Sequence, residues 1–337
     1  MAVLFLDSAN GGDVASRWNS ATLSIIAGAS PSGRAAYRLT NSTGQTLGKN
    51  IPDTASLLVG WKGRLSALSN DNSGNTALFA IRSDSGSLTH LTFCTLSTGV
   101  IRIRRGTATG TILADSAIGI VSVDTWHHFE VRATIADSGG RVEVWVDGVQ
   151  VINFTGDTRN GGTKTDVDNT GYGRTLGGNW DLSDISIASE TTNYGVTMVA
   201  MSLPDGNGNS SGLTGSDADQ VDNYLHVDEA TPDGNTTYVA GDTEGQKDTY
   251  ALANLPSGTW DVIAVQTVLN AIKADAGTRF MRPVLRSGTT DYPGVSVAVS
   301  ESYLSYLEVF STDPDTAAAW TQSGVNALEM GPEVRDS

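Results

Sequence analysis

Cysteine and basic residues are scarce in this sequence, and each scarcity excludes something. Cys94 is the only cysteine among 337 residues, so no disulfide can form within the chain and the fold must be held by apolar packing. Lysine and arginine number 21 against 37 aspartate and glutamate residues, which gives a formal net charge of −16. A nucleic-acid backbone is bound through a basic surface, so this charge predicts that no nucleic acid is a partner.

Long apolar runs are absent as well. No segment approaches the roughly 18 consecutive apolar residues that a membrane-spanning helix requires, and we therefore expect no membrane insertion. The first residues, MAVLFLDSANGG, carry no basic region ahead of their brief apolar run, so they are not typical of a secretory signal. Both absences predict a protein that is made in the cytoplasm.

Familiar catalytic motifs are a third absence. The sequence holds neither a Gly-x-Ser-x-Gly nucleophile motif nor a glycine-rich phosphate loop. A retaining glycanase on a β-sandwich would be similar to enzymes with a Glu-x-Asp-x-x-Glu strand, whose carboxylates act as nucleophile and acid/base. Here Glu143 is followed by Trp145, and Glu130 by Arg132, where that pattern has its Asp. We therefore predict that the chain is not an enzyme.

Short strands and many turns are what the sequence does contain. Thirty-eight glycines accompany short runs rich in Val, Ile and Thr, a composition that is typical of all-β proteins. Apolar and polar side chains alternate in residues 129–135 and again in residues 142–146, as in half-buried strands. Asp147-Gly148 suits a two-residue hairpin turn before a third run at residues 149–154. This stretch predicts an antiparallel meander.

Strand-like runs form two series, separated by a polar connection at residues 189–193. We predict two tandem antiparallel β-sandwich domains of the jelly-roll type, residues 1–190 and 195–337. Residues 204–220, PDGNGNSSGLTGSDADQ, are predicted to form a long polar surface loop. In residues 260–277 the β-branched side chains favour a strand that is buried on both faces, with a helix as the alternative.

Several stretches together resemble a known group of proteins. LFLDSANGGDVASRWN, LLVGWKGRLSAL, the meander TWHHFEVRATIADSGGRVEVWVDGVQVINFTG and NWDLSDISI resemble the laminin-G or concanavalin A-like jelly rolls of bacteriophage virion proteins. IKADAGTRFMRPVLRSGTTDYPG and AAWTQSGVNALEMG are similar to a module that follows such jelly rolls in phage tail and fibre proteins. The resemblance covers nearly the whole chain.

The resemblance implies a non-enzymatic virion structural protein of the tail, the baseplate or a surface fibre. Its partners would be other virion proteins and a host cell-surface polysaccharide, and it would form a homo-oligomer, for which a trimer is one arrangement. Assembly would take place in the host cytoplasm. Two alternatives remain open: a carbohydrate-binding receptor adhesin proper, and a polysaccharide depolymerase.

Candidate sugar-binding residues are aromatic, because apolar sugar faces stack on rings. The candidates are Trp145, Trp180, Tyr172 and Trp61. Trp145 is the most suggestive, since alternation aims it away from the valine face of its own strand. The competing interpretation is that all four are packing residues of the core.

Calcium is a candidate cofactor, because laminin-G-like modules commonly bind it through oxygen ligands from loops. Asp166 and Asp168 lie two residues apart in KTDVDNTG, and Asp71 in NDNSGN is a second candidate. The competing interpretation is that these are solvated turn residues. His127 and His128 are adjacent, so in a strand they point to opposite faces and are not expected to share a metal.

Overall fold

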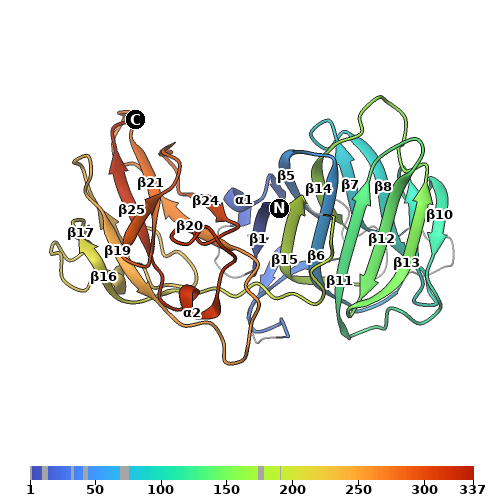
Figure 1. Cartoon of the computed structure of the whole chain (residues 1–337), viewed down its shortest axis with the longest axis horizontal. Helices are drawn as coiled ribbons and strands as arrows, with labels where there is room; N and C mark the ends of the chain where they lie inside the picture. Colours follow the sequence, from blue (N-terminus) through green and yellow to red (C-terminus); the bar gives the residue numbers. More distant parts are fainter. Residues whose placement is uncertain are drawn as a thin grey trace. The chain divides into compact units, whose positions relative to one another are not determined.

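A computed structural model describes residues 2–9, 14–31, 34–40, 45–68, 76–173, 178–189 and 191–337. Regular structure in these residues is almost entirely β-strand (Figure 1), which confirms the predicted all-β class. The described helices are the short α1 (Val14–Arg17) and α2 (Gln322–Val325) and the 3-10 helix η1 (Asn223–His226). Among these residues no helix is both long and apolar enough to cross a membrane.

Contacts between residues divide the described chain into two compact units. The first unit contains the N-terminal strand and Trp18–Val199, and the second contains α1 and Ala200–Ser337. The contacts place the end of the first unit at Val199, a few residues beyond the connection at residues 189–193 that the sequence suggests.

The first unit contains two antiparallel sheets, which we call sheet A and sheet B. The strand order of sheet A is β13-β12-β11-β6-β15-β4-β3, with β1 also paired to β15. Its strands are β1 (Ala2–Asp7), β3 (Ser24–Ile26), β4 (Ala36–Leu39), β6 (Ser56–Leu65), β11 (Trp126–Thr134), β12 (Gly140–Val146), β13 (Val149–Gly156) and β15 (Trp180–Ser189).

The strand order of sheet B is β10-β9-β8-β7-β14-β5-β2. Its strands are β2 (Ser20–Ala21), β5 (Thr46–Thr54), β7 (Thr76–Ser83), β8 (Leu88–Thr95), β9 (Ile101–Arg105), β10 (Thr111–Asp115) and β14 (Val167–Gly173).

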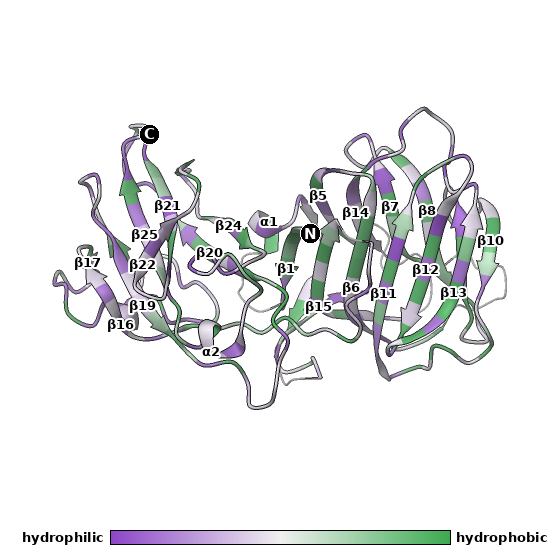
Figure 2. Ribbon diagram, in the orientation of Figure 1, coloured by the Kyte–Doolittle hydropathy of each residue, from purple (hydrophilic) through white to green (hydrophobic). Residues whose placement is uncertain are grey.

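The predicted meander is present as β11, β12 and β13, which lie side by side in sheet A. Figure 2 shows hydrophobic and hydrophilic residues alternating along these strands. Asp147 and Gly148 both have positive φ, 51° and 80°, which is the backbone of the two-residue hairpin turn expected from this dipeptide. Alternation and turn chemistry therefore identified this part of the fold from the sequence.

Aromatic rings fill the core between sheets A and B. The Trp61 ring stacks on Phe129 at a centroid distance of 5.3 Å, and Tyr172 lies 5.5 Å from Trp61 and 5.9 Å from Trp180. Trp61, Tyr172 and Trp180 are 3%, 1% and 0% exposed. The prediction that these three bind a sugar is wrong, because other core rings cover the faces on which a sugar would stack. Their competing interpretation as core residues is confirmed.

The second unit is built around sheet C, with the strand order β16-β19-β25-β21-β22 and β23 also paired to β21. Its strands are β16 (Pro204–Ser211), β19 (Asp248–Leu252), β21 (Phe280–Ser287), β22 (Thr290–Pro293), β23 (Val297–Ala298) and β25 (Glu329–Arg335). Two strand pairs complete the described unit: β17 (Thr214–Gly215) with β18 (Val239–Ala240), and β20 (Val265–Ala271) with β24 (Leu304–Phe310). Leu285, Trp320 and Leu328 are buried at the centre of a separate apolar core.

Two predictions for the second unit have different outcomes. The strand favoured within residues 260–277 is present as β20, but the prediction that it is buried on both faces is wrong, because Val268 is 41% exposed. The predicted loop at residues 204–220 is wrong over its first half, because Pro204–Ser211 forms β16 and pairs with β19.

Candidate functional site

The outer face of sheet B, on the side away from the aromatic core, carries small residues across its centre. Phe79 packs against Trp61 in the core, so alternation places Ala80 on the outer face. The residues in register with Ala80 on the neighbouring strands are Gly171 of β14 and Thr92 of β8, and Gly48 of β5 follows Gly171. We call Gly48, Gly171, Ala80 and Thr92 the small-residue row.

Arg82 lies over this row. A Cβ atom on Gly171 would come within 2.1 Å of Nη1 of Arg82 and within 2.9 Å of its Cζ, so the guanidinium rests directly against the glycine. Its Nη1 donates to Oδ1 of Asn169 at 3.3 Å, and Asn169 in turn donates to Oδ1 of Asn50 at 2.7 Å. Asn50 is exposed, whereas Arg82 is half-buried.

The charge of Arg82 is not balanced by a neighbouring carboxylate in the described part of the chain. Burial lowers the pKa of the Arg82 guanidinium, and no carboxylate acts against this effect. The neighbouring arginines of the same face differ. Arg102 donates to both oxygens of Asp115 at 2.8 and 2.6 Å, and Arg104 donates to the carbonyl of Gly110 at 2.7 Å. Arg82 therefore lacks the carboxylate partner that Arg102 has, and a ligand anion would stabilise its charge.

Trp145 is the predicted sugar-binding residue that does lie at the surface. It is half-buried on the outer face of sheet A, and the Arg132 guanidinium lies 6.0 Å from its ring centroid. It belongs to the other sheet from Arg82, so the structure does not bring the two together. Sequence reasoning missed Arg82, Asn169 and Gly171. Alternation in VDNTGYG places Asn169 and Gly171 on one face of β14, but only the pairing of β14 with β7 brings Arg82 to the same face of sheet B.

The predicted calcium ligands have partners within the protein. Both carboxylate oxygens of Asp168 accept the backbone N–H of Ser85, at 3.1 and 3.0 Å. Asp166 lies 3.4 Å from Nζ of Lys164. Among the described residues, no group of three or more His, Cys, Asp or Glu side chains is arranged to hold a metal ion. Asp71 lies outside the described residues, and calcium binding stays a prediction.

The two adjacent histidines take part in separate contacts. Nδ1 of His127 lies 2.7 Å from Oδ2 of Asp147. His128 points to the outer face of sheet A, where its Nε2 accepts the backbone N–H of Thr197 at 3.1 Å. They do not form a common metal site.

The outer face of sheet A is covered by the segment Tyr194–Val199. Glu130 accepts the backbone N–H of Tyr194 at 2.7 Å, and Asp184 accepts that of Val199 at 3.3 Å. Between these two contacts, Nε2 of His128 accepts the backbone N–H of Thr197. Burial raises the pKa of Glu130 and lowers the pKa of His128 to about 4. The central polar groups of this face are therefore occupied by the chain itself.

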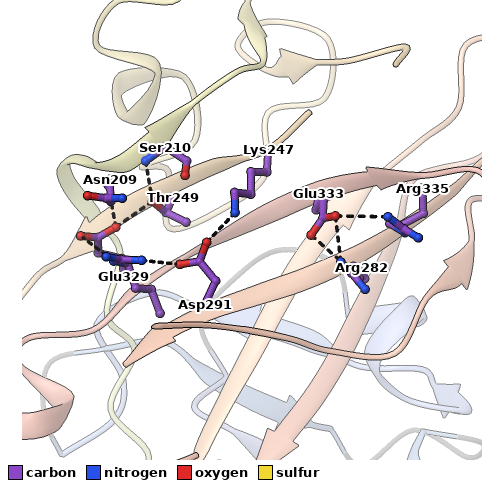
Figure 3. A network of polar contacts seen from close by, with 10 residues as sticks. Asn209, Ser210, Lys247, Thr249, Arg282, Asp291, Glu329, Glu333 and Arg335 are labelled. Atoms are coloured by element: carbon purple, nitrogen blue, oxygen red, sulfur yellow. Dashed lines mark hydrogen bonds and ion pairs between the residues drawn. The ribbon is translucent and has the colours of Figure 1, made fainter. Parts of the chain in front are cut away.

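Sheet C carries two groups of charged side chains, one around Asp291 and one around Glu333, in which hydrogen bonds and ion pairs join the members (Figure 3). Asp291 accepts hydrogen bonds from Lys247 and Arg286, and the hydrogen bond from Lys247 is the main cause of its lowered pKa. Arg282 donates to both oxygens of Glu333 at 3.0 and 2.9 Å. The two groups also include Asn209, Ser210, Thr249, Glu329 and Arg335. These charges have opposite partners, so the two groups stabilise the sheet and leave the outer face of sheet B as the candidate site.

Comparisons with known proteins return solved structures of low similarity. An endo-β-1,4-glucuronan lyase from the fungus Trichoderma reesei is 13% identical with a TM-score of 0.39, over 56% of this chain and 96% of the lyase. The alginate lyase Aly36B is 12% identical with a TM-score of 0.38, over 55% and 96%. The carbohydrate-binding module CBM66 from Bacillus subtilis is 8% identical with a TM-score of 0.33, over 53% and 94%. No protein-family model and no curated protein matches the chain.

These neighbours are carbohydrate-active proteins. The prediction that the chain is not an enzyme is contradicted by them, because polysaccharide lyases are among the matched structures. The missing Glu-x-Asp-x-x-Glu strand concerns one kind of glycanase, so its absence could not support a prediction about all enzymes. At these identities and TM-scores the likeness assigns no substrate and no reaction to this chain.

Proposed function

We propose that the chain binds a polysaccharide, and that the outer face of sheet B is the binding face. The observation that carries this proposal is the small-residue row, in which Gly48, Gly171 and Ala80 stand in register on three neighbouring strands. The row itself is buried, with Arg82 lying over Gly171 and Ser20 next to Gly48. A polymer that lies across the strands would contact the side chains above these small residues, close to the sheet.

Polar groups at the border of the row suit a sugar. The amides of Asn50 and Asn169 and the guanidinium of Arg82 are planar groups with several donors and acceptors, which fix the orientation of a ligand through its hydroxyl groups. They are joined in one chain of hydrogen bonds, so their positions are set before a ligand arrives. Such preorganisation reduces the entropy lost on binding.

Affinity electrophoresis in gels that contain single polysaccharides, neutral and acidic, tests the proposal. The size of each polymer after incubation with the protein is measured in parallel, so that cleavage is detected as well as retention. We expect at least one polymer to retard the protein. Gly48→Leu should weaken this binding about tenfold, because the new side chain would displace Ser20, whose Oγ would lie 2.5 Å from a Cβ atom at this position, and would stand above the row. Tenfold corresponds to roughly 1.4 kcal/mol.

Thr155→Leu is the matched control, because Thr155 is exposed in β13 of sheet A and pairs with Arg141. This variant should bind as the unmodified protein does. Equal losses in both variants, or no retardation by any polymer, would contradict the proposed face. The virion setting, the other virion proteins, the host polysaccharide and the homo-oligomer implied by the resemblance stay predictions.

A further inference from the structure

We infer that the bound polysaccharide is acidic, and that Arg82 binds an anionic oxygen group of one of its sugars. This inference rests on the proposed function and names the chemical class of the ligand. A carboxylate of a uronic acid and a sulfate ester share the chemistry that a guanidinium recognises.

The first step is the position of the guanidinium. It lies against Gly171, where no side chain separates it from the sheet, and alternation along β7 places Arg82 on the same outer face as Ala80. A planar group held against the backbone has little freedom left to lose on binding, which favours a defined two-point contact with an oxyanion.

The second step concerns the hydrogen bonds of Arg82. An arginine side chain has five N–H donors, and the hydrogen bond found for Arg82 in the described structure is one from Nη1 to the neutral amide oxygen of Asn169. At 3.3 Å this is a long hydrogen bond. A half-buried cation with donors to spare is costly in the free protein, and an incoming oxyanion would accept these donors and offset that cost.

The third step is that carboxylates are plentiful in this chain. Acidic residues outnumber basic ones by 37 to 21, and Arg38, Arg64 and Arg102 all form ion pairs with aspartates. The missing partner of Arg82 is therefore not explained by a shortage of acidic side chains. The position next to the Arg82 guanidinium, which an aspartate occupies beside the three other arginines, is therefore open to an anionic group of a ligand.

Matched polymer pairs test the inference. Uronate-containing polysaccharides are compared with their carboxyl-reduced forms, and dextran sulfate is compared with dextran, so that carboxylate and sulfate are distinguished. We expect binding to at least one acidic member and a loss of about tenfold or more with its neutral counterpart, as for a charge-assisted hydrogen bond. The affinity should also fall as salt is added.

Three variants locate the contact. Arg82→Met should weaken binding of the acidic polymer about tenfold or more, and Arg82→Lys should bind better than Arg82→Met because it keeps the charge without the planar fork. Gly171→Ala keeps the charge but displaces the guanidinium, so it should also weaken binding. Arg141→Met is the control, because it removes the same charge from a side chain in β12 of sheet A that is 48% exposed.

The thermal midpoint of Arg82→Met separates a loss of contact from a loss of folding. It should not fall below that of the unmodified protein, since the variant removes a half-buried cation without a carboxylate partner. Equal binding of acidic and neutral polymers, unaffected by Arg82→Met, would overturn the inference and leave the proposed function standing. Failure to bind any polymer would overturn both.

Discussion

Gly63 of β6 shows at the scale of one residue how tightly the aromatic core is packed. A Cβ atom at this position would lie 2.9 Å from Nε1 of Trp180, 3.2 Å from Cε2 of Phe129 and 3.3 Å from Nε1 of Trp61. All three rings are buried, so none can move aside without disturbing its neighbours. A single methyl group is therefore too large for this position.

Gly63→Ala should lower the free energy of unfolding by about 1–3 kcal/mol, the usual cost of overpacking a core. Denaturant unfolding followed by tryptophan fluorescence measures the change. Gly173→Ala is the matched control in the same unit, because among the described residues the nearest neighbour of its Cβ would be the Gln45 carbonyl oxygen, at 3.9 Å. An equal loss in both variants would show that the cost comes from strand glycines in general.

At this scale the sequence predicts which side chains share a face but not which face is the core. In VEVWVDG the valines turn inward and Trp145 outward, whereas in NWDLSDI Trp180 itself turns inward. Alternation is the same in both stretches, and the difference arises only when the second sheet packs on one side. Arg82 was missed because what distinguishes it is that no carboxylate lies next to it in the described structure. The sequence does not show which side chains become neighbours after folding.

The element that most clearly depends on charge is the segment Tyr194–Val199. Nε2 of His128 accepts the N–H of Thr197, which requires that this nitrogen carry no proton. Burial is the main cause of the lowered pKa of His128, nearby Lys62 lowers it further, and Asp147 raises it. Glu130 lies on the same strand and has a raised pKa. It accepts the backbone N–H of Tyr194, at the start of the segment.

The pH dependence of folding tests this attachment. The pKa of His128 is about 4 in the folded protein against 6.5 ordinarily, so between these pH values the unfolded chain binds more protons than the folded chain. Stability should be fully present above about pH 6.5 and fall toward pH 4. For a shift of this size the contribution of His128 is roughly 3 kcal/mol.

Urea unfolding of the unmodified protein and of His128→Gln, measured from pH 4 to pH 7, isolates this contribution. The raised pKa of Glu130 acts in the opposite direction, because its carboxyl binds more protons when folded, but that effect is present in both proteins and cancels in the difference. The unmodified protein should lose more stability on acidification than the variant does. Parallel curves would mean that His128 does not titrate with folding.

At the scale of whole elements, β16 is the strand that the sequence predicts wrongly as a loop. The segment Pro204–Ser211 is rich in Gly, Asn and Ser, residues that are common in turns and depleted in strands. It becomes a strand because β19 offers backbone partners along its edge. Edge pairing of this kind needs backbone hydrogen bonds more than apolar side chains, so composition alone cannot reveal it.

At the scale of the whole molecule, the two units have separate cores. The aromatic core of the first unit is built from residues such as Trp61 and Trp180, and that of the second from Leu285, Trp320 and Leu328. The sequence contains two series of strands, and the two domains with the bounds that we predict from them stay a prediction. Residues 194–199 belong to the first unit, where side chains distant in sequence, those of Glu130, His128 and Asp184, accept their backbone N–H groups.

Separate cores predict two transitions in calorimetry of the full chain. Gly63→Ala should lower the midpoint of one transition, and Leu328→Ala, which truncates a side chain that is 2% exposed, should lower the other by an amount equivalent to about 2–5 kcal/mol. If calorimetry instead shows a single transition and both variants lower its midpoint, the two units unfold together.

Prolines stand at both outer strands of sheet C. Pro204 begins β16 and Pro293 ends β22, and the register of β16 on β19 shifts at two places. A proline has no N–H to donate to a further strand, and a shifted register breaks the regular spacing that a further strand would need. Both features oppose the addition of a strand from another copy of the protein at these edges, and such edge-to-edge addition is the route by which exposed sheets grow into fibrils.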